Sequence, residues 1–291
     1  MAIEYIRPVS HTARWARRLG WFALLILVAG WAAIRFGPLI EPHFLALYAL
    51  ALALGALAAL GGLVGIFSLW RIGAKGGKAS VAAIFLAMIV AAPAGAGYWL
   101  YRSFPQIYEV STDIATPPPW IAEPAADQFW LGARAPAGQA DRDAQTLAYP
   151  ALIPHRYDAS IDKVVESVRE VADDRRIRIR LEKLPPSLTE PPDEPTTPGA
   201  IPIPAPRPDA IPQDVEPDGP RVALMQGVYS ERITGFPFDV VIRLREDADA
   251  TIADVRVAAR YGRSDLSESS RIAAKFLEAL DESVADSGDD N

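Results

Sequence analysis

Hydrophobic positions along the chain change their period near residue 102. Before that point lie three apolar runs without a charged residue, Leu19 to Ile34, Phe44 to Trp70 and Val81 to Leu100. A helix rises about 1.5 Å per residue, so about 20 residues cross the roughly 30 Å hydrocarbon core of a bilayer. The pattern predicts that residues 1–102 form a three-helix transmembrane anchor.

The first run is short and has two interpretations. A basic start, an apolar run and the small pair Ala32-Ala33 are also typical of a secretory signal peptide. The aromatic residues Trp21, Phe22 and Trp31, and the second run that follows closely, favour a retained helix instead. No ionisable side chain lies inside any run, whereas ion pathways through a membrane need such groups. The three helices are therefore interpreted as an anchor.

Basic residues around the runs predict the orientation, because cytoplasmic loops carry an excess of Lys and Arg. They gather before the first run and between the second and third, at Arg7, Arg14, Arg17, Arg18, Arg71, Lys75 and Lys78. The loop between the first two runs holds Arg35 alone. We expect a cytoplasmic N-terminus in the inner (plasma) membrane and an extracytoplasmic domain over residues 103–291. Tyr98, Trp99 and Tyr101 would then lie at the outer membrane surface.

Shorter periods follow residue 102. Residues 104–144 show no regular period, but helical spacing is present over residues 160–171 and 265–284. Strand-like patterns follow the order of the chain over residues 176–182, 221–230, 236–245 and 251–261. Consecutive strands flanked by helices predict a soluble α+β domain, an antiparallel sheet with two helices on one face.

Three segments have a special composition. Residues 184–220 contain thirteen prolines and few bulky apolar residues, which predicts a flexible insertion rather than a Pro-rich ligand for a partner. The acidic tail over residues 285–291 is predicted to be disordered. Gly61 and Gly65 form a GxxxG spacing, which is either a helix-packing seam or a chance product of an Ala- and Gly-rich run. The composition favours chance.

Charge and residue counts exclude several classes of function. The net charge of −7 divides into +7 for residues 1–102 and −14 for residues 103–291, so a nucleic-acid partner is not expected. The chain contains no cysteine, and His155 is the one histidine after residue 102, so neither a metal site nor a cofactor is predicted. No G-x-S-x-G, H-E-x-x-H, Walker A or G-x-G-x-x-G motif is present, and no catalytic residue is predicted.

A group of charged residues near the C-terminus is the candidate binding site. Four of them alternate with apolar residues on two strands, and two lie at the start of the last helix: Asp239, Arg243, Arg256, Arg260, Asp265 and Arg271. One hypothesis is a polar sheet face that binds an anionic ligand or a partner. The other is a ladder of ion pairs between neighbouring strands, with Asp265 capping the helix.

Residue runs in the same region resemble the domain-of-unknown-function 1499 family. They are IYEVSTD (residues 107–113) followed by Pro117-Pro118, GFPFDVVIR (235–243), and DVRVAARYGRSDL (254–266) followed by Arg271-Ile272. The resemblance covers roughly residues 104–183 and 221–284. It implies an uncharacterised bacterial envelope protein and supplies no activity.

The chain departs from the usual pattern of that family at several polar positions. Val257 and Ala259 stand where the family tends to have serines, and Ser267 and Ser269 where it tends to have Gly and Asn; one acid, Asp239, follows Phe238. We therefore expect a membrane-anchored module that binds an envelope protein or an amphipathic small molecule. The alternatives are an envelope hydrolase that uses carboxylates or His155, and a structural membrane protein.

Overall fold

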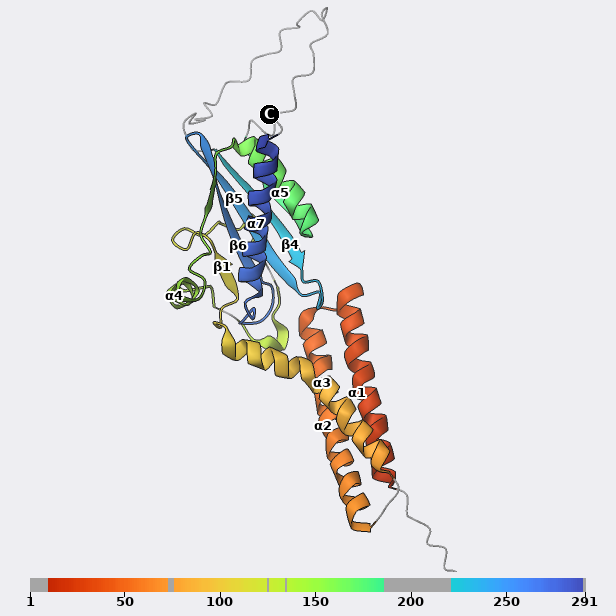
Figure 1. Cartoon of the computed structure of the whole chain (residues 1–291). Coiled ribbons are helices and arrows are strands. Elements are labelled where there is room, and N and C mark those ends of the chain that lie inside the picture. Colours follow the sequence, from red (N-terminus) through yellow and green to blue (C-terminus); the bar gives the residue numbers. More distant parts are fainter. Residues whose placement is uncertain (1–9, 73–75, 125, 134, 186–220, 290–291) are drawn as a thin grey trace, which may run out of the picture.

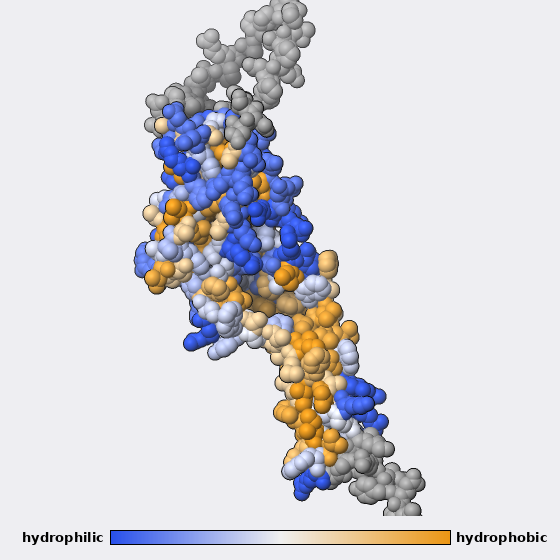
Figure 2. Space-filling view, in the orientation of Figure 1, coloured by the Kyte–Doolittle hydropathy of each residue, from blue (hydrophilic) through white to orange (hydrophobic). Residues whose placement is uncertain are grey.

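The computed structural model describes residues 10–289 apart from residues 73–75, 125, 134 and 186–220. In Figure 1 a bundle of three helices extends from one end of a sheet domain. The helices are α1 (His11–Phe36), α2 (Glu41–Ile72) and α3 (Gly77–Ser103). Each is long and apolar enough to cross a membrane, which confirms the three predicted helices. Figure 2 shows apolar surface along the bundle and mainly hydrophilic surface on the sheet domain.

Glycines of α2 let the helices of the bundle approach closely. A Cβ atom at Gly61 would lie 2.9 Å from the Cβ atom of Ala16, and one at Gly65 would lie 2.9 Å from that of Ala13. Real Cβ atoms essentially never come so close, so both positions need glycine. The GxxxG spacing is thus a packing seam between α1 and α2. The interpretation as a chance spacing was wrong, because composition alone does not show which helix faces the glycines.

α3 bends in its second half, where its yellow part turns away from the other two helices (Figure 1). Pro93 lies in the second half of α3 and lacks the N–H group of a regular helix. The hydroxyl group of Tyr48 on α2 donates to the carbonyl oxygen of Val90 at 3.0 Å and accepts from the N–H group of Ala94 at 2.7 Å. A side chain thus enters the backbone hydrogen-bond ladder of α3, which together with proline is a known cause of a kink.

The sheet domain contains six antiparallel strands in the order β1-β6-β5-β4-β3, with β2 also paired to β6. Their bounds are β1 Glu109–Ser111, β2 His155–Tyr157, β3 Ile177–Lys183, β4 Val222–Ser230, β5 Pro237–Asp247 and β6 Ala250–Ala259. The four longer strands were predicted. The three-residue strands β1 and β2 were not, because they are too short to show a period. A 3-10 turn, η1 (Phe129–Leu131), and a helix, α4 (Gln139–Ala148), also lie in the region without a period.

Two helices cover one face of the sheet and form the core with it. These are α5 (Ile161–Asp174) and α7 (Glu268–Asp289), which lie side by side in Figure 1. Val164 and Val168 of α5 and Phe276 and Leu280 of α7 are fully buried against the apolar face of β5 and β6. The predicted α+β fold with both helices on one face is confirmed.

Strand β3 departs from the strict alternation that its sequence shows. Its register with β4 shifts between Ile179 and Leu181, so that Arg180 is an extra residue on this strand. Such a bulge turns the following side chains to the other face. Leu181, expected on the apolar face with Ile177, is 40 % exposed.

The structure describes only part of the predicted insertion and of the predicted tail. Leu184 packs on the core and Pro185 is buried, while residues 186–220 lie outside the described residues. α7 continues to Asp289, and the last two residues of the predicted tail lie outside the described residues. Extending an existing helix is far easier than starting one, and an acidic composition does not prevent it.

Candidate functional site

The polar face of the sheet is covered by the chain itself. Residues 112–124 and 126–128, here called the strap, cross this face between β1 and η1. The side-chain oxygen of Gln226 on β4 accepts from the N–H groups of Ile121 at 2.8 Å and Ala122 at 3.0 Å. Near the other end, the Gln128 amide donates to the carbonyl oxygen of Arg260 at 2.9 Å. The face predicted to bind a ligand is therefore closed to large molecules.

Under the strap, Arg243 lies in a buried ion-pair network. Its Nε atom donates to Asp254 at 2.9 Å, and its Nη2 atom donates to Asp113 of the strap at 2.9 Å. Asp254 is fully buried and also contacts Arg245 at 3.1 Å. Burial alone would raise the pKa of Asp113, but hydrogen bonds from Thr116 and Arg243 outweigh it and hold that pKa below its ordinary value.

Arg256 and Arg260 have partners of their own on this face. Arg256 forms an ion pair with Glu109 of β1 at 2.8 Å, and its guanidinium group stacks 4.7 Å from the ring centre of Trp120. Arg260 binds Asp239, with 3.1 Å between its Nε atom and Oδ2, and this hydrogen bond raises the pKa of Arg260. These contacts match the ion-paired ladder that was the alternative hypothesis for these residues.

The remaining two candidates lie at the start of α7. Asp265 accepts hydrogen bonds from the N–H groups of Ser267 at 2.9 Å and Ser269 at 3.1 Å, so it caps the helix; burial raises its pKa. Arg271 donates to Glu268 at 2.6 Å. The structure therefore distributes the six predicted residues over a covered face, a helix cap and an exposed helix turn, and does not gather them in one site.

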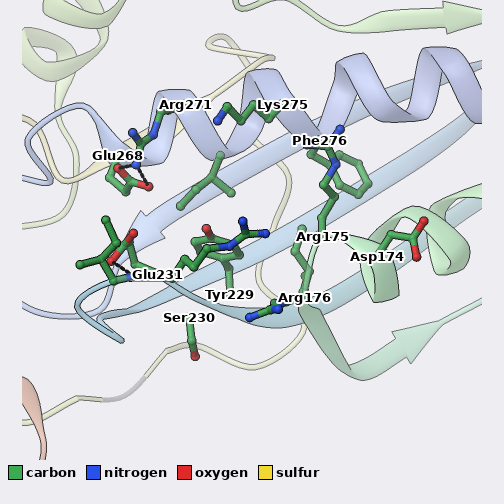
Figure 3. Close-up of a pocket in the computed structure, with 14 residues that line it drawn as sticks. Asp174, Arg175, Arg176, Tyr229, Ser230, Glu231, Glu268, Arg271, Lys275 and Phe276 are labelled. Atoms are coloured by element: carbon green, nitrogen blue, oxygen red, sulfur yellow. Dashed lines mark hydrogen bonds and ion pairs between the residues drawn. The ribbon is translucent and has the colours of Figure 1, made fainter. Parts of the chain in front are cut away.

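A groove of about 360 Å³ brings Arg271 together with residues that were not predicted. It lies between the end of α5, the first half of α7 and the end of β4, and we call it the α5–α7 groove. Figure 3 shows its charged side chains around an apolar floor. Its basic residues come from the α5–β3 turn, the β4–β5 turn and α7: Arg175, Arg176, Arg232, Arg271 and Lys275. Its acidic residues are Asp174, Glu231 and Glu268.

Two of these acids are already engaged, whereas Arg271 is the one cation of the five that forms an ion pair with a described residue. Glu268 binds Arg271, and the carboxylate of Glu231 accepts from backbone N–H groups and the hydroxyl of its own turn. Within the described part of the chain, the side chains of Arg175, Arg176, Arg232 and Lys275 form no ion pair. The groove thus offers uncompensated positive charge within a domain whose net charge is strongly negative.

The floor of the groove is apolar. Ile177, Ile272 and Phe276 line it and are all buried, and Tyr229 lies half-buried beside them. Burial and the neighbouring carboxylates of Glu268 and Glu231 raise the pKa of Tyr229, so its hydroxyl group stays protonated. A cationic rim over an apolar floor fits a molecule with an anionic head and an apolar body.

The backbone at Arg176 adopts a left-handed conformation, with φ of 63°. Such a conformation ends many helices, but glycine or asparagine usually occupies it. A larger side chain there costs on the order of 1 kcal/mol. The left-handed backbone of the α5–β3 turn thus favours glycine or asparagine, but arginine occupies the position. The side chain of this arginine lines the groove.

The groove lies beside the end of α1 nearest the sheet domain. The carbonyl oxygen of Arg232 accepts from Arg35 at 3.1 Å, and that of Ile233 accepts from the indole N–H of Trp31 at 2.8 Å. Both Arg232 and Ile233 also line the groove. An apolar molecule in the groove would thus lie close to the apolar surface of the helix bundle.

His155 lies at a different hollow, of about 500 Å³, on the other side of α7. Its Nδ1 atom is 2.8 Å from Asp281, which also accepts from the hydroxyl of Tyr157 at 2.7 Å. Burial and this hydrogen bond raise the pKa of Tyr157. Ser270 lines the same hollow, but it precedes Asp281 by eleven positions on α7, which is about 16 Å along the helix. A Ser–His–Asp arrangement is therefore not formed by these residues.

Sequence reasoning missed most of the groove. Arg175 and Arg176 are adjacent basic residues just after a predicted helix in an acidic domain, which was a usable signal. Arg232 and Lys275 gave no signal, because one lies in a turn and the other on an ordinary exposed helix face. Glu109 and Asp113 stood within the quoted runs, but a sequence does not show that they reach across to β6 and β5.

Comparisons with known proteins agree with the predicted family. The model of the family described as "Protein of unknown function (DUF1499)" matches residues 109–280, which is more than half of the chain. Comparisons with curated proteins and with solved structures found no match. The matched segment runs from β1 into α7, and so includes the strap, the ion-paired face and the groove. The chain belongs to the domain-of-unknown-function 1499 family.

Proposed function

We propose that this protein is a membrane-anchored module that binds the anionic head of an amphiphile in the α5–α7 groove. The observation that carries the proposal is the set of four cations that form no ion pair with a described residue, Arg175, Arg176, Arg232 and Lys275, above a buried apolar floor. Charged hydrogen bonds to an anion are about twice as strong as neutral ones. The rim would hold the head, and the floor would contact the apolar part.

The position of the groove supports an amphiphile from the same membrane. Arg232 and Ile233 line the groove and bond to the end of α1, so a bound molecule would need to leave the bilayer only in part. The proposal includes the orientation that the basic residues predict, with a cytoplasmic N-terminus and the sheet domain outside the inner membrane of a bacterial envelope.

The other functions have less support. An envelope hydrolase based on His155 would need a nucleophile within hydrogen-bond reach, and Ser270 lies about 16 Å away along α7. A protein partner is compatible with the acidic surface, but no contact among the described residues points to one. A purely structural protein has no use for uncompensated cations in a groove.

Native mass spectrometry of the full chain in detergent micelles tests the proposal. Phosphatidylglycerol should bind with a defined stoichiometry, and phosphatidylcholine, which has no net charge, should not. Arg176→Gln and Lys275→Gln should each weaken binding about tenfold or more, because each removes a charged hydrogen bond worth roughly 1.5–3 kcal/mol.

Arg178→Gln is the matched control, since Arg178 is exposed on β3 and does not line the groove. This variant should bind like the parent chain. Equal affinity of all three variants for phosphatidylglycerol would refute the groove as the site. Binding of phosphatidylcholine with the same affinity would refute the role of the anionic head.

A further inference from the structure

Two separate parts of the sheet domain touch the ends of α1 and α2. The first is η1, where the indole N–H of Trp130 donates to the carbonyl oxygen of Pro42 at 2.9 Å and the ring of Phe129 lies 5.2 Å from that of His43. Pro42 and His43 belong to the first turn of α2. η1 therefore lies level with the end of a helix that is long enough to cross a membrane.

The second part is the β4–β5 turn, residues 231–236. Besides the two bonds to α1, the ring of Phe236 lies 5.9 Å from that of Phe44 on α2. We call η1 and this turn together the base of the sheet domain. Five contacts from two distant segments fix the base at the level where α1 ends and α2 begins.

Apolar side chains of the base remain uncovered by the protein. Ile233 is 70 % exposed and Trp130 is 60 % exposed, and Phe36 at the end of α1 is exposed beside them. Trp and Tyr favour the membrane–water interface, where the ring is apolar and the polar group reaches water. Side chains of this kind at this level are suited to lipid rather than to bulk water.

The second half of α3 adds to the same layer. After its bend it leaves the bundle and runs past the lower end of the sheet domain in Figure 1. A Cβ atom at Gly95 would meet nothing within 4 Å, and Tyr98 and Trp99 are about two-thirds exposed. The exposed tyrosine and tryptophan side chains of this stretch are suited to the membrane–water interface.

We propose that the base of the sheet domain and residues 94–103 of α3 lie in the interface of the bilayer that the three helices cross. The occupant of these surfaces is the headgroup and upper acyl layer of that bilayer. The chain thus contacts the membrane in two ways, through the spanning helices and through the base of the sheet domain at the bilayer surface. This contact does not depend on a ligand in the groove.

Site-directed spin labelling tests the proposal, because the chain contains no cysteine. Single variants Ile233→Cys and Trp99→Cys of the full chain are labelled and reconstituted into phosphatidylcholine bilayers. The matched control is Ile153→Cys, a similarly exposed isoleucine just before β2. His155 of β2 pairs with Ala253 of β6, which pairs with Leu244 of β5, seven positions along the strand from Pro237 at the base, or roughly 23 Å.

Collision with oxygen, which enters lipid, is compared with collision with a water-soluble nickel complex. We expect the labels at residues 233 and 99 to collide with the nickel complex several-fold less often than the label at residue 153. Equal nickel collision rates at residues 233 and 153 would overturn the contact of the base. Equal rates at residues 99 and 153 would overturn the placement of α3. Both replaced side chains are exposed, so the fold tolerates the labels.

Discussion

Replacing Asp113 by Asn should open the strap. Asp113 and Arg243 are 14 % and 10 % exposed, and their hydrogen bond is 2.9 Å long. Asn keeps one oxygen for the N–H group of Thr116 but turns an amide toward the guanidinium group. A hydrogen bond to a charged group contributes about 1.5–3 kcal/mol. Arg243 keeps its ion pair with Asp254 in the variant, so we expect the free energy of strap opening to fall by about this amount. Strap amides should then exchange roughly ten- to a hundredfold faster.

The effect depends on pH with a definite sign. The folded protein holds the pKa of Asp113 below its ordinary value of 3.8, because its hydrogen bonds outweigh its burial. A carboxyl group with a lowered pKa stabilises the fold above its unfolded pKa, and this contribution is lost as the pH falls through the folded value. The difference between parent and variant should therefore be full at neutral pH and should close below about pH 4.

Hydrogen–deuterium exchange of the full chain measures the opening. The reporters are the N–H groups of Thr112, Ile121 and Ala122, which bond to β6 and to Gln226. Asp249→Asn is the control, because Asp249 is exposed in the β5–β6 turn and forms no ion pair with a described residue. Unchanged strap exchange in Asp113→Asn at neutral pH would show that the pair does not hold the strap. A difference that persists at low pH would show that charge is not its cause.

Three further predictions concern the bundle and its orientation. Gly65→Ala should destabilise the full chain by about 1–3 kcal/mol when unfolding is measured in detergent, because its methyl group would lie 2.9 Å from the Cβ atom of Ala13. Gly95→Ala is the control, and it should not destabilise the chain because its methyl group would lie in open space. Tyr48→Phe removes the hydroxyl group that bridges the carbonyl oxygen of Val90 and the N–H group of Ala94 on α3. A spin label on the outer half of this helix should therefore change its depth in the membrane. Ile153→Cys should react with a membrane-impermeant maleimide added outside intact cells; reaction only after lysis would reverse the proposed orientation.

The sequence predicted those elements whose length shows a period. The three apolar runs and the four long strands each repeat their pattern often enough to be recognised, and α5 and α7 show apolar residues on one side. β1 and β2 contain three residues each, and their pairing with β6 depends on segments more than ninety positions away. A pattern within one short segment cannot predict pairing with a segment so distant in the sequence.

The candidate site was predicted less well, for an electrostatic reason. Alternation placed Arg243, Arg256 and Arg260 on one face of the sheet correctly, but it did not show what lies over that face. The strap supplies Asp113 and the stacking ring of Trp120, so these arginines stabilise the fold where a ligand was expected. Free cations are found instead on α5, α7 and a turn, where no period distinguishes a groove from ordinary solvent-exposed positions.

The β4–β5 turn connects the two proposals. Ile233 lines the α5–α7 groove, and its carbonyl oxygen also accepts from Trp31 at the end of α1. The carboxylate of Glu231 stabilises the turn by accepting hydrogen bonds from the N–H group of Ile233 and the hydroxyl group of Thr234. If the base lies in the interface, the groove opens within reach of lipid headgroups, and an anionic amphiphile can enter without crossing water. Loss of binding in a variant that lifts the base, with the groove cations unchanged, would show that membrane contact supplies the ligand.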